Sequence, residues 1–498
     1  MVTIPRVVVA GTHSGCGKTT VATGLMAALG ERGLRVAGFK VGPDFIDPSY
    51  HSVACGRPGR NLDVFLSGAD LVGPLFAHGA AGCDIAVVEG VMGLYDGRAG
   101  AGEEASTAQV AKLLQAPVLL VVDARAMARS AAAVVLGFRD LDRSVDLAGV
   151  VLNGVGSERH ESMLREAIDP LGLPVVGVLR RQRELEIEAR HLGLVPASER
   201  TLGLESQVRA LGGYVGTALD LRTVVRIARA APAMRWVPWS PSGGIGGSGG
   251  PEPPEPVSIG SSSSDRDVPA FGGDASISSG DVSVHGARPA VEHRELQRRR
   301  HACIAVASGP AFSFVYRENL EMLTARAAEL TLFDPAVDEA IPPDAGALYL
   351  GGGFPEVHAE ALSANEPMRA AVRAFAASGG AVVAECGGLL YLCRLLGGVP
   401  MCGVLDADAA MTGRLTLGYR TATAAGSWLF DAGSSVRAHE FHYSSVTPGA
   451  SGAPAWLLGE RAEGFVQGGV HASFLHGHWA ATPAVADRLV QRALGRAA

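Results

Sequence analysis

The chain has 498 residues, of which 47% are hydrophobic and 19% charged, and its formal net charge is -7. At roughly 150 residues per domain, a chain of this length is expected to fold into more than one domain. The acidic balance and the scattered Lys and Arg residues exclude nucleic acid as the main partner, because phosphate backbones are bound by clustered positive charge. The cysteines form no CxxC pair or metal-binding array, so we expect reduced thiols in a cytoplasmic protein.

The first residues, MVTIPRVVVAG, enter an apolar strand directly and lack the charged segment and cleavage site of a secretory signal. No apolar stretch approaches the roughly 20 residues that a membrane helix needs. We therefore expect a protein without a membrane partner.

A glycine-rich turn follows the first apolar run, in the stretch VVVAGTHSGCGKTT at 7–20. Its glycines leave room for backbone N–H groups to surround phosphates, and the following helix offers its positive N-terminal end. Lys18 supplies a mobile cation and Thr19 a hydroxyl for Mg²⁺. We predict an ATP site at Gly15, Gly17, Lys18, Thr19 and Thr20. The alternative is an ordinary glycine-rich turn between a strand and a helix.

Short β-branched runs alternate with helical patterns from 7 to about 230: a helix from Lys18 to Gly33, and the runs RVAGFK, DIAVVEG, APVLLVVDA, LAGVVLNGV and LPVVGVL. Runs that are apolar on both faces are typical of a parallel sheet covered by helices on each side. Residues 1–231 are therefore predicted to form a doubly wound α/β domain. Ligands of such domains bind at the carboxyl ends of the strands.

The composition changes abruptly after Pro232, where the chain continues as PSGGIGGSGGPEPPEP. Such a Gly/Ser/Pro-rich segment has too few large apolar side chains to offset the entropy of ordering it. We predict a disordered linker over 232–298 and a second α/β domain over 299–498. The second domain begins at ACIAVASGPAF and includes a helix near 365–378 and a strand at 381–385.

Cys386 directly follows that strand, and Gly387 and Gly388 open a predicted helix through Leu395. A strand-to-helix elbow holds a nucleophile in a tight turn, and the helix N-terminus favours the thiolate. Cys386 is therefore the predicted nucleophile. The alternative is an inert thiol in the core.

A thiol with a pKa of about 8.5 needs a base, and FLHGHW places His476 and His478 after another apolar run. Alternation along a strand puts both imidazoles on one face, so spacing alone does not choose between them. The glycine loop at 351–353 is suited to present backbone N–H groups to an oxyanion, and we assign this role to Gly353 and Gly387.

Taken together, these segments resemble the cobyrinic or hydrogenobyrinic acid a,c-diamide synthases, the glutamine-dependent amidases of corrin biosynthesis. The resemblance spans nearly the whole chain except the linker. It is carried by GTHSGCGKTT, FKVGPDFIDPSYH, GRNLD, VVEGVMGLYDG, PVLLVVDA, VLNGVGSERH, GPAFSFVYRENLE, LYLGGGFPE, ECGGLLYL, HEFHYS and ASFLHGHW. The P-loop itself resembles the GTxxxxGKT loops of dethiobiotin-synthetase-like ATPases, because Thr12 stands where the strict motif has its first glycine.

The resemblance implies an N-terminal P-loop ATPase domain that activates a substrate carboxylate and a C-terminal class I-like glutamine amidotransferase domain that makes ammonia. It implies that Cys386 is the nucleophile and His476 its base. It also implies that Thr19, Asp47 and Glu89 bind the metal, and that the substrate is bound by Asp44, Asp47 and Asp96.

The residues alone agree on the location of these acids. Asp44 and Asp47 follow the RVAGFK run and Glu89 ends DIAVVE, so all three are expected beside Lys18, where carboxylates hold Mg²⁺. The alternative is that they are solvated loop acids or helix caps. Asn153 is expected either to contact adenine or to form a turn. His439 and His442 are expected to border the cysteine pocket or simply to pack there.

Two features depart from the family pattern. The linker is longer than the architecture needs, and no HPE-type acid follows the histidine, which leaves the third catalytic group open and allows a Cys-His dyad. The expected function is ATP- and glutamine-dependent amidation of the a- and c-acetate groups of hydrogenobyrinic or cobyrinic acid in cobalamin biosynthesis. The expected small-molecule partners are the corrin macrocycle, L-glutamine and ATP, with Mg²⁺.

Two alternatives remain at this stage: the same chemistry on another tetrapyrrole, such as nickel-sirohydrochlorin or the cobyric acid series, or a P-loop ATPase switch with a degenerate amidotransferase domain. The oligomeric state is left open, although the homodimer is the commonest assembly.

Overall fold

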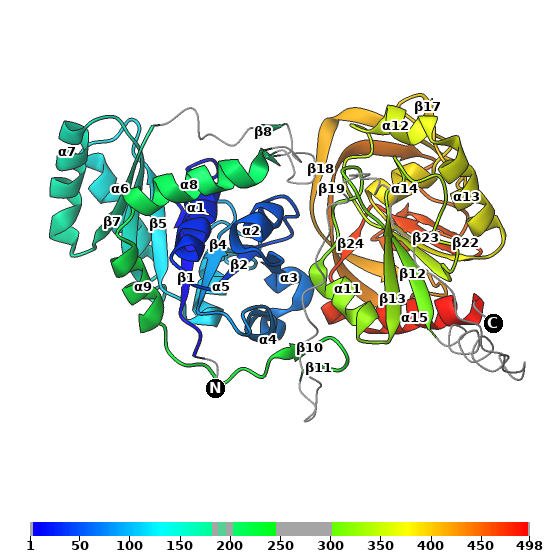
Figure 1. Ribbon diagram of the computed structural model, residues 1–498, viewed down its shortest axis with the longest axis horizontal. Helices are drawn as coiled ribbons and strands as arrows, with labels where there is room; N and C mark the ends of the chain where they lie inside the picture. Colours follow the sequence, from blue (N-terminus) through cyan, green and yellow to red (C-terminus); the bar gives the residue numbers. More distant parts are fainter. Residues whose placement is uncertain (1–2, 182–188, 191–192, 195–202, 246–300, 497–498) are drawn as a thin grey trace, which may run out of the picture.

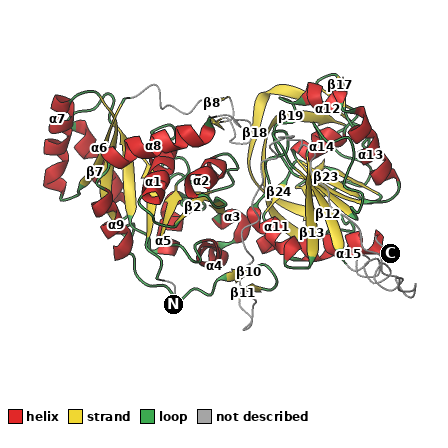
Figure 2. Cartoon of the chain, viewed as in Figure 1, coloured by secondary structure: helices red, strands yellow, loops and turns green. Residues whose placement is uncertain are grey.

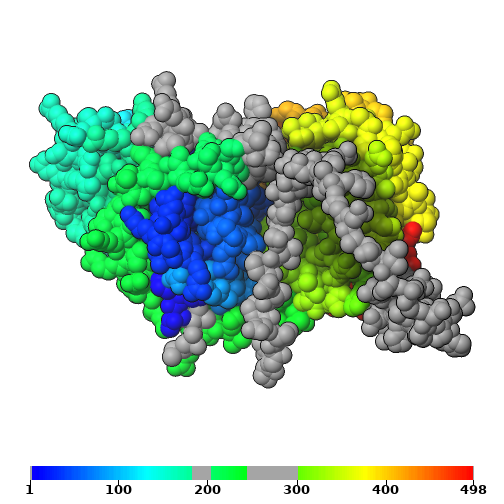
Figure 3. Space-filling model, in the orientation of Figure 1, coloured from blue at the N-terminus to red at the C-terminus, as the bar shows by residue number. Residues whose placement is uncertain are grey.

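The computed structural model describes residues 3–181, 189–190, 193–194, 203–245 and 301–496. Two α/β halves lie side by side along the long axis of the molecule (Figure 1). The N-terminal half, blue to green in Figure 3, occupies one end, and the C-terminal half occupies the other. Among the described residues, no helix is both long and apolar enough to cross a bilayer.

The N-terminal half is built on a seven-stranded sheet in the order β3-β2-β4-β1-β5-β6-β7, and every neighbouring pair is parallel. Its strands are β1 (Arg6–Gly11), β2 (Val36–Val41), β3 (Arg60–Leu62), β4 (Ile85–Glu89), β5 (Val118–Asp123), β6 (Leu147–Val155) and β7 (Val175–Arg180). Its helices are α1 (Lys18–Glu31), α2 (Asp47–Cys55), α3 (Val64–Ser67), α4 (Ala69–Gly79), α5 (Thr107–Leu114), α6 (Ser130–Leu141), α7 (Glu158–Ile168), α8 (Leu204–Ala218) and α9 (Leu221–Ala230).

Both faces of this sheet are buried, as the apolar runs predict. Along β1, Val7 and Val9 pack with α1, α8 and α9, while Val8 and Ala10 face the opposite layer formed by α4, α5, α6 and α7. Helices flank the strands on each side in Figure 2. Because β2, β4 and β1 are neighbours, the loops that follow their carboxyl ends meet at one edge of the sheet.

The described start of the predicted linker, residues 232–245, packs against both halves. It contains β10 (Trp239–Ser240) and β11 (Gly244–Ile245), and Trp239 is 2% exposed. The carbonyl of Pro232 accepts a hydrogen bond from Arg6 at 2.7 Å, and that of Pro241 accepts one from Arg326 at 2.8 Å. This stretch therefore differs from the expected tether, because its tryptophan supplies apolar area to bury. The rest of the predicted linker lies outside the described residues.

The C-terminal half contains a six-stranded sheet in the order β13-β12-β14-β15-β23-β22, parallel except for β22. Its strands are β12 (Ala302–Ala307), β13 (Ala328–Phe333), β14 (Ala347–Leu350), β15 (Ala381–Glu385), β22 (Phe465–Gln467) and β23 (Val470–Ser473). Helices α11 (Arg317–Thr324) and α15 (Ala484–Arg496) cover one face. The other face is covered by α12 (Ala359–Ala364), α13 (Glu366–Ala377) and α14 (Gly387–Leu392).

A second sheet in this half has the order β17-β16-β18-β19-β24 and carries a side pair, β20 and β21. It consists of β16 (Leu395–Leu396), β17 (Val399–Pro400), β18 (Asp408–Ala424), β19 (Ser435–Thr447), β20 (Trp456–Leu458), β21 (Arg461–Glu463) and β24 (His476–Gly477). No strand was predicted from the sequence over residues 395–463, which contain β16 to β21. The expected helix through Leu395 ends at Leu392, because the chain turns there into β16. The sheet brings HEFHYS, on β19, against His476 on β24.

The remaining strands are a short pair, β8 (Ala189–Arg190) and β9 (Gly193–Leu194).

Candidate functional sites

The first site, called here the P-loop site, begins at the turn between β1 and α1. Gly15 and Gly17 have φ of 79° and 100°, in the left-handed region that favours glycine. A Cβ at Gly17 would clash with the side chain of Asn153, whose Nδ2 donates a hydrogen bond to the Cys16 carbonyl at 2.9 Å. Asn153 therefore holds the phosphate loop from β6 in this structure. Thr20 lies in the first turn of α1.

Lys18 extends back along its own loop, where Nζ donates to the His13 carbonyl at 3.1 Å. Burial lowers the pKa of this ammonium, and the charge of Lys40 lowers it further. A lysine held in this way is close to the loop backbone that would surround phosphates, and an anionic ligand there would stabilise its charge.

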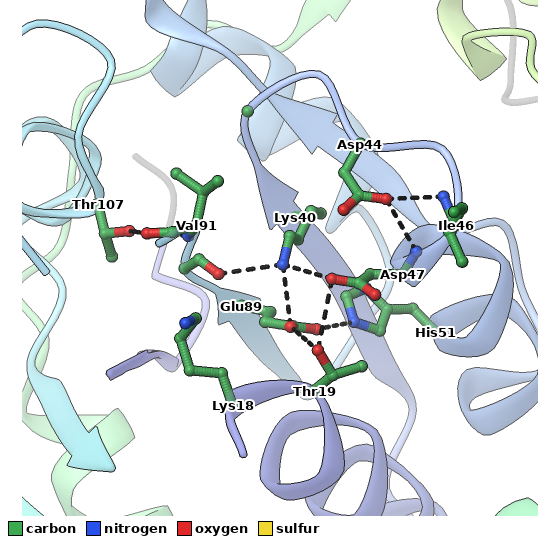
Figure 4. A network of polar contacts seen from close by, with 12 residues as sticks. Lys18, Thr19, Lys40, Asp44, Ile46, Asp47, His51, Glu89, Val91 and Thr107 are labelled. Atoms are coloured by element: carbon green, nitrogen blue, oxygen red, sulfur yellow. Dashed lines mark hydrogen bonds and ion pairs between the residues drawn. The ribbon is translucent and has the colours of Figure 1, made fainter. Parts of the chain in front are cut away.

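At the edge of the sheet, Lys40 meets Thr19, Asp47 and Glu89, as Figure 4 shows. The Thr19 hydroxyl donates to Glu89 Oε1 at 2.6 Å and lies 3.4 Å from Asp47 Oδ2. Lys40 Nζ lies 2.5 Å from Asp47 Oδ2 and 2.9 Å from Glu89 Oε1. His51 Nε2 lies 2.7 Å from the second oxygen of Glu89. The network is buried: Glu89 and His51 are 0% exposed.

The charges in this network do not balance. Burial alone would raise the pKa of Glu89, but Lys40 and His51 outweigh it and hold the pKa below its ordinary range. Burial, followed by the Asp44 and Glu89 carboxyls, raises the pKa of Asp47. Three acids, Asp44, Asp47 and Glu89, thus face the two ammonium groups of Lys40 and Lys18, so a further cation would be stabilised there.

Two further predicted acids have local partners. Asp44 Oδ1 accepts hydrogen bonds from the backbone N–H groups of Ile46 at 2.7 Å and Asp47 at 3.0 Å, within the loop that leads into α2. Asp96 Oδ2 accepts from the Gly93 N–H at 2.9 Å. Asp96 also lines, with Thr12, a pocket of about 400 Å³ whose opposite wall is the apolar face of α6.

The second site, called here the cysteine site, is centred on the turn after β15. Cys386 has φ of 48°, a left-handed conformation that is strained for a side chain with a Cβ, and α14 begins at the next residue. Its backbone N–H donates to the Ser473 carbonyl at 2.7 Å, and its Sγ lies 3.9 Å from the Phe441 carbonyl. Burial, followed by the charge of Glu356, raises the pKa of the Cys386 thiol.

The glycine loop after β14 lies against this elbow. A Cβ built on Gly387 would be 3.0 Å from the backbone nitrogen of Gly353, so the two predicted oxyanion donors are neighbours. Gly353 has φ of 157°. A Cβ on Gly352 would clash with the ring of His476, so that imidazole lies directly against the same loop.

The two histidines of FLHGHW are separated by the structure. His476 lies on β24, pairs in register with His439, and borders the glycine loop. His478 instead has its ring centroid 5.0 Å from Tyr316, and its Nε2 is 3.6 Å from Glu318 Oε2. Thus His476 borders the loop beside the cysteine elbow, whereas His478 is directed toward α11.

Carboxyl groups flank β24 without contacting the imidazole of His476. Glu385 Oε1 accepts from the Gly477 N–H at 3.3 Å, and Glu463 Oε1 accepts from the Phe474 N–H at 2.8 Å. Burial raises the pKa of both Glu385 and Glu463 to about 7. Within the described residues, Nδ1 of His476 has no hydrogen-bond partner. Among the described residues, therefore, no carboxyl orients the His476 imidazole through its Nδ1 atom.

His439 and His442 both lie on β19, where His439 pairs in register with His476. His442 Nδ1 is 2.8 Å from the Ser444 carbonyl, and its ring stacks on Phe474 with centroids 3.7 Å apart. Burial lowers the pKa of His439 to about 4 and that of His476 to about 3. Both imidazoles are consequently neutral at ordinary pH.

The two halves are joined by buried contacts that the sequence analysis missed. Arg60 bridges Glu318 at 2.7 Å and Glu321 at 2.5 Å, and the Tyr419 hydroxyl donates to Asp63 at 2.8 Å. A charged Lys40 at the end of an apolar strand was a usable signal, because a buried charge needs a partner. Arg60 and Glu318 gave no local signal, since 258 positions separate them.

Comparison with known proteins gives matches for both halves. Residues 7–195 match the family described as "CobQ/CobB/MinD/ParA nucleotide binding domain", and residues 303–484 match the "CobB/CobQ-like glutamine amidotransferase domain". The chain is 54% identical over 493 residues to the "Hydrogenobyrinate a,c-diamide synthase" of Streptomyces coelicolor, covering 98% of this chain and 97% of the relative.

Two further relatives match over nearly the same length of the chain, at lower identity. A protein of the same name from Thermobifida fusca is 45% identical, covering 97% of this chain and 96% of the relative. The "Cobyrinate a,c-diamide synthase" of Dehalococcoides mccartyi is 39% identical, covering 98% of each chain.

Proposed function

Because the chain belongs to the hydrogenobyrinate and cobyrinate a,c-diamide synthase family, we propose that it amidates the a- and c-acetate carboxylates of hydrogenobyrinic acid with ATP and glutamine. The observation that carries this proposal is the presence of both a P-loop site and a cysteine site on a chain similar to these synthases over 98% of its length. Relatives named for the metal-free macrocycle reach 54% identity and those named for cobyrinate 39%, which supports the metal-free substrate.

The P-loop site would activate the carboxylate. A carboxylate resists attack by ammonia because its oxygen is a poor leaving group, and transfer of the γ-phosphoryl group from ATP converts it into an acyl phosphate and releases ADP. Lys18 and the N–H groups of the loop at 15–19 would balance the phosphate charge. In the pocket beside Thr12 and Asp96, the apolar wall of α6 is suited to one face of a macrocycle.

Thr19, Asp47 and Glu89 would hold Mg²⁺, which prefers oxygen ligands and retains waters. The fit is supported by the Thr19 hydroxyl, which lies within 3.4 Å of both carboxylates, and by the surplus of acids around Lys40. In the described part of the chain no cluster of three or more His, Cys, Asp and Glu could hold a metal, so ATP oxygens and water would complete the shell. Bound there, the cation would neutralise charge on the transferred phosphoryl group.

The cysteine site would supply the nitrogen. Cys386 attacks the side-chain amide carbon of glutamine, and its proton passes through His476 to the departing ammonia. The N–H groups of Gly353 and Gly387 would receive the negative charge that develops on the amide oxygen. Water then hydrolyses the thioester to glutamate, while ammonia attacks the acyl phosphate and displaces phosphate. Two such cycles give the diamide.

The test separates the sites by nitrogen donor. Cys386→Ala should abolish amide formation from glutamine yet retain amide formation from free ammonia, and assays on hydrogenobyrinic and cobyrinic acid side by side identify the macrocycle. Loss of both activities in a folded variant would refute this division of labour. An ATPase switch would instead hydrolyse ATP at a rate indifferent to either macrocycle.

A further inference from the structure

One loop of the N-terminal half reaches the cysteine site. Phe45 lies between Asp44 and Asp47, on the connection from β2 to α2, and its ring centroid is 5.1 Å from that of His476. The same ring is 4.5 Å from Tyr316 and stacks on Phe314 at 5.1 Å with 9° between the planes. A short loop thus carries an acid of the P-loop site and a ring that touches the proposed base of the other site.

The orientation of His476 depends on such packing. In hydrolases with a catalytic triad, an acid bonded to the imidazole fixes its tautomer and direction. Nδ1 of His476 has no such partner among the described residues, and the nearby carboxyls of Glu385 and Glu463 bind backbone N–H groups instead. The ring is held between Phe45 and the glycine loop, where Gly352 leaves no room for a side chain.

The loop is also tied to the P-loop site. Asp47 contacts Lys40 at 2.5 Å and lies 3.4 Å from the Thr19 hydroxyl. Asp44 accepts hydrogen bonds from the N–H groups of Ile46 and Asp47, so the residues on either side of Phe45 are fastened to each other. A ligand that changes the contacts of Asp47 would therefore act on the segment that also carries Phe45, and the ring of Phe45 packs on His476.

We propose that Phe45 is a positioning residue for the glutaminase reaction: it sets the His476 ring and couples its position to occupancy of the P-loop site by ATP and the substrate carboxylate. This inference rests on the proposed function. Its chemical purpose is timing, because ammonia released before the acyl phosphate forms would escape to water instead of forming an amide.

The test compares Phe45→Leu with Phe65→Leu, a matched change in the same interface whose ring packs on Tyr419 at 4.5 Å and not on His476. For Phe45→Leu, the ratio of glutamine-dependent to ammonia-dependent amide formation should fall about tenfold, mainly through kcat for glutamine. Phe65→Leu should keep the ratio within about twofold of wild type. Phe45→Tyr, which retains the ring, should restore it.

A pH profile supplies a readout that general loss of structure would not move. Burial lowers the pKa of His476 to about 3, and the neighbouring His439 and His442 on β19 act in the same direction. Without the Phe45 ring, water reaches the imidazole and its pKa rises toward the ordinary 6.5. The base must be neutral to accept a proton. The acid limb of the pH–rate profile for glutamine hydrolysis should therefore shift to higher pH in Phe45→Leu and stay in place in Phe65→Leu.

An unchanged ratio and pH profile in Phe45→Leu, or equal changes in both variants, would overturn the inference. Circular dichroism verifies the fold, and Phe45→Met is scored by the same criteria if the leucine variant does not fold. Failure of the proposed function is distinguishable, because it would appear in the wild type as no amide from either donor, or in Cys386→Ala as loss of ammonia-dependent synthesis.

Discussion

The P-loop site and the cysteine site differ in the charge state of their buried side chains. In the P-loop site, buried Lys40, Asp47, Glu89 and His51 form ion pairs and hydrogen bonds with one another. In the cysteine site, the thiol of Cys386 and the imidazole of His476 are both neutral, and burial is the largest cause in each case.

The difference follows from what each site is proposed to bind. Nucleotide phosphates carry fixed charge, so the site that receives them needs charged groups held in place by one another. A thiol that attacks an amide needs its proton removed only during the reaction, so a neutral, dry pair is a resting state that glutamine and a correctly placed base can activate. Three substitutions sharpen or break this contrast.

The largest effect is expected from Lys18→Ala. Because Lys18 would serve only phosphoryl transfer, amide formation from both glutamine and ammonia should fall about a thousandfold or more. Glutamine hydrolysis measured without ATP should stay at the wild-type rate. The control is Lys112→Ala, which removes a lysine paired with Glu103 and Asp142 on the same half of the protein. Steady-state rates with each nitrogen donor check this, and selective loss of the glutamine-dependent rate would contradict it.

The second effect is on stability. Lys40→Met should lower the free energy of unfolding by about 3–5 kcal/mol, because it leaves the buried Asp47 and Glu89 carboxylates without their shared cation. Lys112→Met, which breaks more exposed pairs, should cost less than about 1 kcal/mol. Urea denaturation of the two variants measures both values. Equal, small losses would show that the carboxyls of the P-loop site are neutral, and the contrast between the sites would disappear.

The smallest effect is the pH dependence of stability from Glu463. Burial raises the pKa of its carboxyl from 4.5 to about 7. The folded state therefore keeps this proton where the unfolded state loses it, so stability falls as pH rises from about 4.5 to about 7, by up to about 3 kcal/mol. Glu463→Gln should remove that part of the fall, as denaturation across this pH range would reveal.

Glu440 on β19 supplies the matched control. Burial would raise its pKa, but His442 and Arg420 outweigh burial and lower it from 4.5 to about 2. The stability that the ionised Glu440 carboxylate contributes is present above about pH 4.5 and is lost as pH falls toward about 2. Glu440→Gln should therefore flatten the acid side of the stability curve only. Because burial also raises the pKa of Glu385 to about 7, part of the fall should remain in Glu463→Gln, and a fall as large as that of the wild type would contradict the assignment to Glu463.

The parallel sheet of the N-terminal half was largely predictable because most of its strands are apolar runs, and such runs are buried on both faces; β3, with the sequence RNL, is the exception. The long β18–β19 hairpin was not, because β18 mixes buried, half-buried and exposed residues without the strict alternation that identifies a strand. Consequently the sequence indicated HEFHYS as a neighbour of the pocket without showing that its strand pairs with His476.

The sequence by itself determined the features that contiguous residues impose on the backbone: the left-handed glycines before Lys18 and the strained turn that carries Cys386 after β15. Only the tertiary structure decided how distant groups pair, since Lys40 meets Glu89 across neighbouring strands and Phe45 meets His476 across the interface between the halves. The physical reason is that local motifs are fixed by dihedral preferences over a few residues. Burial of a charge or a ring instead depends on which surfaces the whole chain brings together.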